Sequence, residues 1–120
     1  MHVELWHNPA CSNSRKALAL IRQAGIEPTV VEYLRTPPSK ARLAEVIAAA
    51  GLTVRDAIRE KETVYAERGL GDPSQPDDAL LDAMAAAPVL INRPFVISAL
   101  GTRLARPPER VLEILPPRIA

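Results

Sequence analysis

The sequence predicts an α/β fold with a mixed four-stranded sheet and a helical insertion. The prediction rests on the patterns at the beginning, in the middle and at the end of the chain. The chain begins with a strand, a helix and a second strand, continues with a stretch of helical patterns, and ends with two strands and a helix. A length of 120 residues suits one ordinary domain. We therefore expect a single domain over residues 1–120, with the helical insertion at about residues 53–87.

The first three elements form a strand-helix-strand unit. Apolar and charged residues alternate over Val3–Trp6, which predicts a strand. A helical pattern follows Cys11–Ser14 and stops at Gly25. Thr29–Leu34 is rich in strand-forming residues and is bounded by prolines, so we expect a second strand there. A helical crossover of this kind makes the two strands parallel.

The middle of the chain carries helical patterns rather than strand patterns. A helix is expected after Ser39, with Gly51 as its C-terminal stop. Shorter helices are expected at Val54–Glu60 and Glu62–Arg68. Another helix begins at Pro76, where the acidic residues that follow suit the positive end of a helix.

The last third changes back to strand patterns. Val89–Ile97 is apolar around one Arg-Pro step, Leu100–Thr102 signals a turn, and Arg103–Ala105 alternates, which together predict a hairpin. Pro107 and the proline after it open a final helix. The residues of that helix expected to face inward are Val111, Leu112 and Leu115. This order of elements is typical of a thioredoxin-like fold with a helical insertion.

The composition excludes several classes of function. With 15 basic and 14 acidic residues, the net charge of +1 gives no reason to expect nucleic acid or an acidic membrane as partner. The single cysteine rules out an internal disulfide, a zinc site of several thiolates and a C-x-x-C redox pair. We see no signal peptide and no apolar run long enough to span a membrane. We therefore expect a cytoplasmic protein.

Cys11 lies where the first strand gives way to the first helix. Unpaired N–H groups at a helix start favour negative charge, so they stabilise a thiolate and can also hold a tetrahedral oxyanion. His7 precedes Cys11 by four residues, and a protonated imidazole there would lower the thiol pKa further. A free cysteine is often a buried small apolar residue, but the polar loop around Cys11 argues against burial. We therefore expect a reactive thiol.

Several separated segments resemble one known family, the glutaredoxin-coupled arsenate reductases. His7–Arg15 is similar to the active-site loop of that family, and Glu27–Pro38 is similar to its second strand and the turn that follows. Leu90–Pro94 and Leu100–Pro107 resemble its later signatures. The resemblance covers essentially the whole chain and implies a thioredoxin-like fold with a helical insertion.

The resemblance also implies a reaction and a set of site residues. Arsenate would be reduced to arsenite through an adduct on Cys11, with electrons from glutathione and then glutaredoxin, and with no bound metal or organic cofactor. His7 and Ser14 match the histidine and serine near the thiolate, and Pro94 matches a cis-proline. The three oxyanion-binding positions fall on Arg59, Arg93 and Arg106. Without the resemblance the default interpretation of an arginine is a solvated charge, and Arg59, expected on a helix, would be unremarkable. Arg93, beside apolar strand residues, and Arg106, at a strand end, are better candidates from the sequence itself.

Two departures keep other functions open. Ser12 and Asn13 follow the cysteine where plasmid-borne reductases have Gly-Thr, and the chain ends at Ala120 without their longer C-terminal extension. Both traits resemble a chromosomal sister branch of the family. One alternative is a thiol-dependent binding or regulatory protein without reductase activity. A cysteine phosphatase would need arginine at position 17, which is alanine. Arg15 and Lys16 are expected to face solvent or to add diffuse positive potential, and the role of Arg15 stays open.

Overall fold

The structure is a computed structural model that describes residues 1–117, and it divides into two compact units. The first unit comprises Met1–Thr36 together with the chain from Arg93 onward, and the second comprises Pro37–Asn92. The second unit is thus inserted between two strands of the first, and it is wider than the expected residues 53–87 because it also includes the helix after Ser39. That the chain acts as one domain over 1–120 stays a prediction, and residues 118–120 lie outside the described part.

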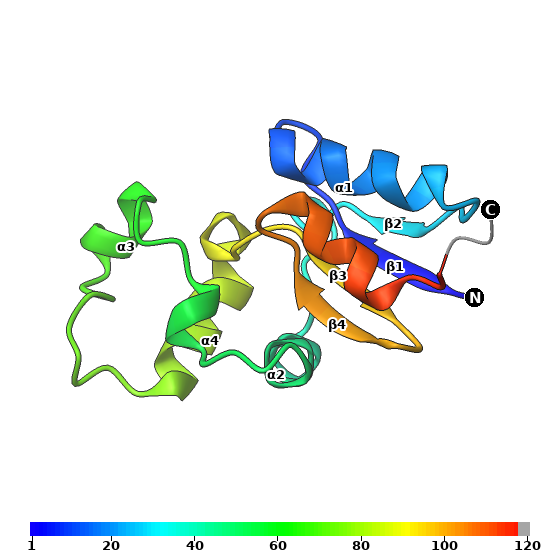
Figure 1. The fold of residues 1–120 in the computed structure, drawn as a ribbon. Helices are drawn as coiled ribbons and strands as arrows, with labels where there is room; N and C mark the ends of the chain where they lie inside the picture. Colours follow the sequence, from blue (N-terminus) through cyan, green and yellow to red (C-terminus); the bar gives the residue numbers. More distant parts are fainter. Residues whose placement is uncertain (118–120) are drawn as a thin grey trace. The chain divides into compact units, whose positions relative to one another are not determined.

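The first unit is built on a mixed four-stranded sheet (Figure 1). The order is β2-β1-β3-β4, with β1 parallel to β2 and antiparallel to β3, and with β3 and β4 joined as a hairpin. The strands are β1 (Val3–Trp6), β2 (Thr29–Val31), β3 (Phe95–Ser98) and β4 (Gly101–Leu104). This arrangement confirms the predicted thioredoxin-like sheet.

One core lies between the sheet and two helices, α1 (Ser12–Gln23) and the 3₁₀ helix η3 (Pro108–Ile114), which pack side by side (Figure 1). Its buried members are Val3, Leu5, Ala17, Ile21, Val96, Ala105, Val111, Ile114 and Leu115. The expected inward position of Leu112 is wrong, because its side chain is 53% exposed and Ile114 is buried instead. A 3₁₀ helix has three residues per turn, so Pro108, Val111 and Ile114 share its inner face.

The second unit is helical. Its elements are α2 (Lys40–Ala49), η1 (Arg55–Ala57), α3 (Thr63–Glu67), α4 (Asp77–Ala86) and η2 (Pro88–Leu90). Helix α2 packs against α4, and Lys40 Nζ joins them through Asp78 at 2.6 Å and Asp82 at 2.9 Å. Leu80, Leu81 and Met84 are buried, as the helical pattern predicts. In residues 1–117 no helix is long and apolar enough to cross a membrane.

The expected helix at Val54–Glu60 is wrong. Only the short η1 forms there, and Ile58 is extended and pairs with Ile91 in an antiparallel bridge. The Arg59 N–H donates to the Leu90 carbonyl at 2.7 Å. Backbone bonds to a segment distant in sequence thus replace the helical ones, and Arg59 does not lie on a helix.

The strand boundaries differ from the expected ones for local reasons. Strand β3 starts only at Phe95, because Pro94 has no N–H to donate and the residues Val89 and Leu90 belong to η2. The expected strand Thr29–Leu34 ends at Val31, since the chain turns at Glu32, whose carbonyl accepts N–H groups three and four residues later. The Arg93–Pro94 bond is cis, as the resemblance implied, and Arg106–Pro107 is a second cis bond.

Candidate active site

Cys11 occupies the N-cap position of α1, as the sequence predicts. Its N–H donates to the Asn8 carbonyl at 3.0 Å, and its own carbonyl accepts the first helical N–H, from Arg15, at 3.0 Å. The expectation that a polar loop leaves this residue uncovered is wrong, because Cys11 is only 9% exposed. The loop from Asn8 closes back on itself, so a short side chain at its end is covered although its neighbours are polar.

The surroundings of Cys11 favour its thiolate form. Burial raises the pKa of the thiol, but the backbone N–H of Ser14, the Arg93 side chain and the N–H of Asn13 all hydrogen-bond the sulfur. The positive charge of Arg93 acts in the same direction, and the net effect is a pKa below the ordinary value. The direction of this effect agrees with the predicted activation at a helix start, and Arg93 is the neighbouring cation.

His7 acts on the loop through Ser14. The two side chains share a hydrogen bond of 2.6 Å between Nδ1 and Oγ, and both residues are buried. The Asn8 N–H donates to the same Ser14 oxygen at 3.0 Å. Burial lowers the pKa of His7, Glu32 opposes this effect, and Arg22 and Arg15 add to it. The lowered pKa favours the neutral imidazole, and the hydrogen bond that His7 makes goes to Ser14. That a protonated His7 lowers the pKa of Cys11 stays a prediction from the sequence.

Two of the three predicted arginines lie in the same unit as Cys11. Arg93 is half-buried directly before the cis-proline and bonds the sulfur. The exposed Arg106 extends Nη1 to the Arg93 carbonyl, at 3.0 Å. Arg59 belongs to the second unit, where its Nε donates to Glu62 at 3.1 Å. The assignment of Arg59 to oxyanion binding stays a prediction from the sequence.

The sequence interpretation missed two residues that shape the cysteine loop. The Asn8 side-chain oxygen accepts a hydrogen bond from the Ala10 N–H at 3.0 Å. Asparagine side chains often bond the backbone two residues later in turns, so an Asn-Pro step favours this contact. Arg15, expected to face solvent or to add diffuse positive potential, is exposed and also donates from Nη1 to the Pro9 carbonyl at 2.8 Å. The Asn-Pro step was visible in the sequence, whereas the Arg15 contact depends on how the loop folds back onto α1.

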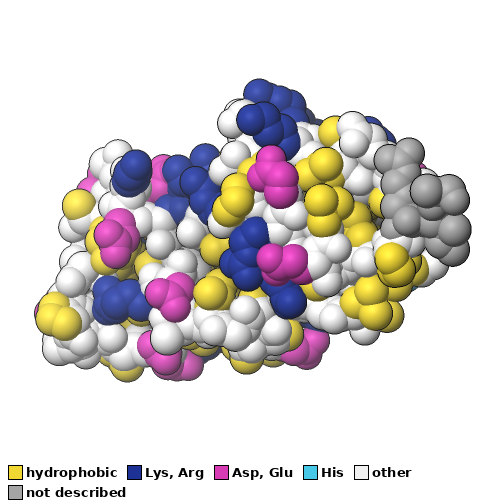
Figure 2. Space-filling model, in the orientation of Figure 1, with side chains coloured by type: hydrophobic (Ala, Val, Ile, Leu, Met, Phe, Trp, Pro, Cys, Tyr) yellow, Lys and Arg dark blue, Asp and Glu magenta, His cyan; other side chains and the backbone are white. Residues whose placement is uncertain are grey.

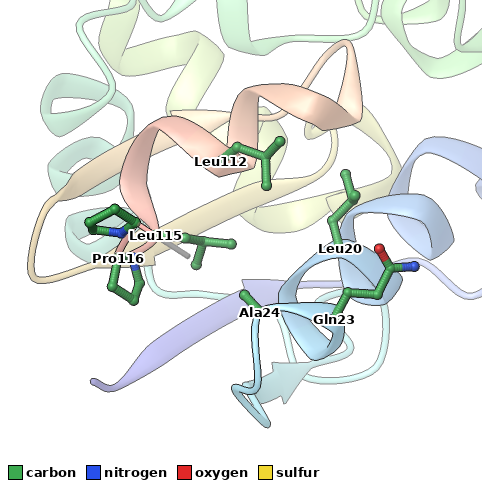
Figure 3. A pocket seen from close by; sticks show the side chains of 7 residues that line it. Leu20, Gln23, Ala24, Leu112, Leu115 and Pro116 are labelled. Atoms are coloured by element: carbon green, nitrogen blue, oxygen red, sulfur yellow. The ribbon is translucent and has the colours of Figure 1, made fainter. Parts of the chain in front are cut away.

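Two hollows flank α1 in this unit. One has a volume of about 380 Å³, is mainly apolar, and lies between α1 and η3, where Leu20, Ala24 and Leu112 line it (Figure 3). The other has a volume of about 540 Å³ and starts at the cysteine loop. Its lining residues are His7, Pro9, Arg15, Leu18, Ala19, Arg22 and Gln23. Basic side chains gather over the start of α1 in Figure 2.

The structure offers no evident metal centre in the part that it describes. Among residues 1–117, no three His, Cys, Asp or Glu side chains are grouped so that they could hold a metal ion. That the reaction needs no metal or bound cofactor stays a prediction.

Comparisons with known proteins agree on one family. The model of the ArsC family matches residues 6–114. An arsenate reductase of Rhizobium meliloti is 68% identical over 116 residues, which are 97% of this chain and 83% of that protein. An arsenate reductase of Escherichia coli K12 is 49% identical over 96% of this chain and 82% of its own. Among solved structures, the arsenate reductase from Vibrio cholerae aligns with a TM-score of 0.92 and 49% identity, over 96% of this chain and 98% of that one.

Proposed function

Because the chain belongs to the ArsC family, we propose that it is an arsenate reductase that converts arsenate to arsenite with Cys11 as the nucleophile. One observation carries the assignment of the nucleophile. The Cys11 sulfur lies at the start of α1, where two backbone N–H groups and the Arg93 guanidinium hydrogen-bond it and lower its pKa. A thiolate in that setting is nucleophilic, and the groups around it also suit an anionic substrate.

Arsenate is a tetrahedral oxyanion, like phosphate. Guanidinium groups bind such oxygens with two parallel hydrogen bonds, a geometry that lysine does not reproduce. We assign this role to Arg93, which contacts the sulfur, and to Arg106, which contacts the Arg93 backbone. Arg59 is the third proposed ligand, and its assignment rests on sequence resemblance alone. His7 and Ser14 would hold the loop in position around the nucleophile.

The proposed chemistry takes two electrons from thiols. The Cys11 thiolate attacks arsenic and displaces one arsenate oxygen as water, which gives a sulfur-bound As(V) adduct. The thiol of glutathione then attacks the Cys11 sulfur and loses its proton. An S–S bond forms and the S–As bond breaks, with its electron pair staying on arsenic, which leaves as As(III) in arsenite. Glutaredoxin reduces the resulting mixed disulfide by thiol exchange and restores Cys11.

The single cysteine supports this dependence on external thiols. With Cys11 alone, the chain cannot close an internal disulfide to supply both electrons. Glutathione enters as a co-substrate rather than as a resident cofactor, and the scheme uses no metal. A cytoplasmic location fits the proposal, because the glutathione pool there is reducing.

A coupled assay tests the proposed function. Purified protein is mixed with arsenate, glutathione, glutaredoxin and glutathione reductase, and NADPH consumption is followed. We expect consumption that requires both arsenate and this protein. A small disulfide substrate, added separately, checks that the coupling enzymes are active. If they are active and arsenate elicits no consumption, the reductase assignment is wrong and a thiol-dependent binding or regulatory protein replaces it.

A further inference from the structure

Arg15 contacts the loop that carries Cys11 with both its backbone and its side chain. Its backbone N–H donates to the Cys11 carbonyl at 3.0 Å, which is the first hydrogen bond of α1. Its side chain reaches back beyond the start of the helix, where Nη1 donates to the Pro9 carbonyl at 2.8 Å. A single residue of the helix thus holds the loop both at the nucleophile and at the turn before it.

The peptide group between Pro9 and Ala10 is held at both ends. It is the central peptide of a turn that the Asn8 carbonyl closes by accepting the Cys11 N–H at 3.0 Å. The carbonyl of this peptide accepts from Arg15, and its N–H donates to the Asn8 side-chain oxygen at 3.0 Å. Rotation of the central peptide is what distinguishes the common types of β-turn. Because both of its ends are bonded, this peptide is fixed in one orientation, and so is the direction in which the chain enters Cys11.

The backbone conformation of Cys11 decides what its sulfur contacts. Cys11 is extended, with φ −92° and ψ 123°, as is usual for an N-cap residue. In that conformation a short side chain lies over the open N–H groups of the first helical turn, and here those of Asn13 and Ser14 bond the sulfur. A rotation of the preceding peptide changes this conformation and moves the sulfur away from its donors. The setting of the nucleophile therefore depends on the turn that precedes it.

We propose that Arg15 is a positioning residue of the reaction, whose guanidinium holds the Pro9–Ala10 peptide and thereby keeps the Cys11 sulfur over the start of α1. This role rests on the proposed function, in which that sulfur attacks arsenate. The strongest effects on the pKa of the thiol come from burial, from the two helical N–H groups and from Arg93, and Arg15 is not among them. Arg15 therefore acts through the loop rather than through its charge.

Alkylation of Cys11 by iodoacetamide tests the proposal without turnover, because its rate as a function of pH gives the pKa of the thiol. Arg15→Met removes the donor and leaves a side chain that suits an exposed helical position. Asn8→Ala releases the other end of the same peptide without a change of charge. Lys16→Met is the matched control, since Lys16 is exposed on the same helix and the substitution removes the same charge as Arg15→Met.

We expect Arg15→Met and Asn8→Ala each to raise the pKa of Cys11, and the double variant to raise it by less than the sum of the two shifts. Release of either end already frees the peptide, so the two substitutions are not additive. In the coupled assay we expect Arg15→Met to lower kcat about fivefold with little change in the KM for arsenate, as for the loss of one hydrogen bond that positions the nucleophile. Lys16→Met should leave both measurements unchanged.

The proposal is overturned if Arg15→Met titrates as the parent does, or if Lys16→Met shifts the pKa equally, which would show an effect of charge. Additive shifts in the double variant would also overturn it, because the two side chains would then act independently. A raised KM with unchanged kcat in Arg15→Met would make Arg15 a ligand of arsenate and overturn the positioning role. If the parent shows no arsenate-dependent NADPH consumption, the proposed function fails, and the alkylation series still decides whether Arg15 positions the sulfur.

Discussion

The imidazole Nδ1 of His7 and the hydroxyl Oγ of Ser14 lie 2.6 Å apart, and the Asn8 N–H donates to the same hydroxyl. The serine oxygen therefore joins the end of β1, the cysteine loop and the first turn of α1. Because the Asn8 N–H already occupies one acceptor site of that oxygen, the hydroxyl proton is available to a neutral imidazole. The histidine thus supports the loop through Ser14.

Removing that hydroxyl should destabilise the protein. Ser14→Ala leaves the buried His7 ring nitrogen and the Asn8 N–H without a partner, so we expect the free energy of unfolding to fall by about 1–3 kcal/mol. Urea unfolding measures the change. Ser12→Ala is the matched control, since Ser12 lies in the same helical turn but is exposed, and we expect its effect to stay within about 0.5 kcal/mol. Equal effects of the two substitutions would refute the linking role of Ser14.

His7 should make stability depend on pH. Its pKa is lowered in the folded protein, mainly by burial, so between that value and about 6.5 the unfolded chain binds a proton that the folded one does not. The free energy of unfolding should therefore fall as the pH drops below about 6.5 and level off below the folded pKa of His7. We expect His7→Gln to flatten this part of the curve, measured by unfolding at a series of pH values. The exposed His2 is the control, and a His2→Gln variant that changes the curve equally would contradict the assignment.

The Cys11 thiol should titrate below the ordinary pKa of about 8.5. The rate of alkylation by iodoacetamide as a function of pH gives this pKa. Arg93→Gln removes both a hydrogen bond to the sulfur and a positive charge, so we expect the pKa of Cys11 to rise in that variant. Arg35 is exposed in the same unit, and Arg35→Gln should leave the titration unchanged. A Cys11 pKa that is the same in the parent and in Arg93→Gln would exclude a direct effect of Arg93.

Substitution of Arg93 by lysine should show whether arsenate binding needs the geometry of the guanidinium group or only its positive charge. Arg93→Lys keeps the cation but loses the two-pronged hydrogen bonding, so we expect the KM for arsenate to rise about tenfold. Initial rates in the coupled assay at varied arsenate concentration measure it, with Arg35→Lys as control. Unchanged kinetics in Arg93→Lys would remove Arg93 from the oxyanion site.

Turnover should depend entirely on the sulfur of Cys11. Cys11→Ser replaces the thiolate by a hydroxyl that is far less nucleophilic at neutral pH, so we expect arsenate-dependent NADPH consumption to fall to the rate without enzyme. The circular dichroism spectrum and the unfolding midpoint should stay close to those of the parent. Arsenate-dependent turnover that survives in Cys11→Ser would refute the covalent mechanism.

Local patterns predicted the elements that depend mainly on their own residues. Val3–Trp6, the helix after Cys11 and the helix after Pro76 form where their periodicity places them. The predictions of local structure were wrong where a segment interacts with another part of the chain that is distant in sequence. The bridge between Ile58 and Ile91 replaces a helix, and the tight winding of η3 exposes Leu112. Neither outcome can be read from propensity, because each depends on hydrogen bonds and packing between segments far apart in sequence.

The sequence by itself determined the place of Cys11, because a strand that leads into a helix is a local arrangement and Cys11 stands at its junction. From that place it predicted Cys11 as the nucleophile. The single cysteine of the sequence is also the reason for our proposal that the electrons come from other thiols. Only the tertiary structure decided which groups act on the sulfur. Arg93 reaches it from a segment more than eighty residues away through the antiparallel pairing of β1 and β3, and burial lowers the pKa of His7. Position along the chain does not specify solvation or long-range proximity, and these two quantities set the pKa of both groups.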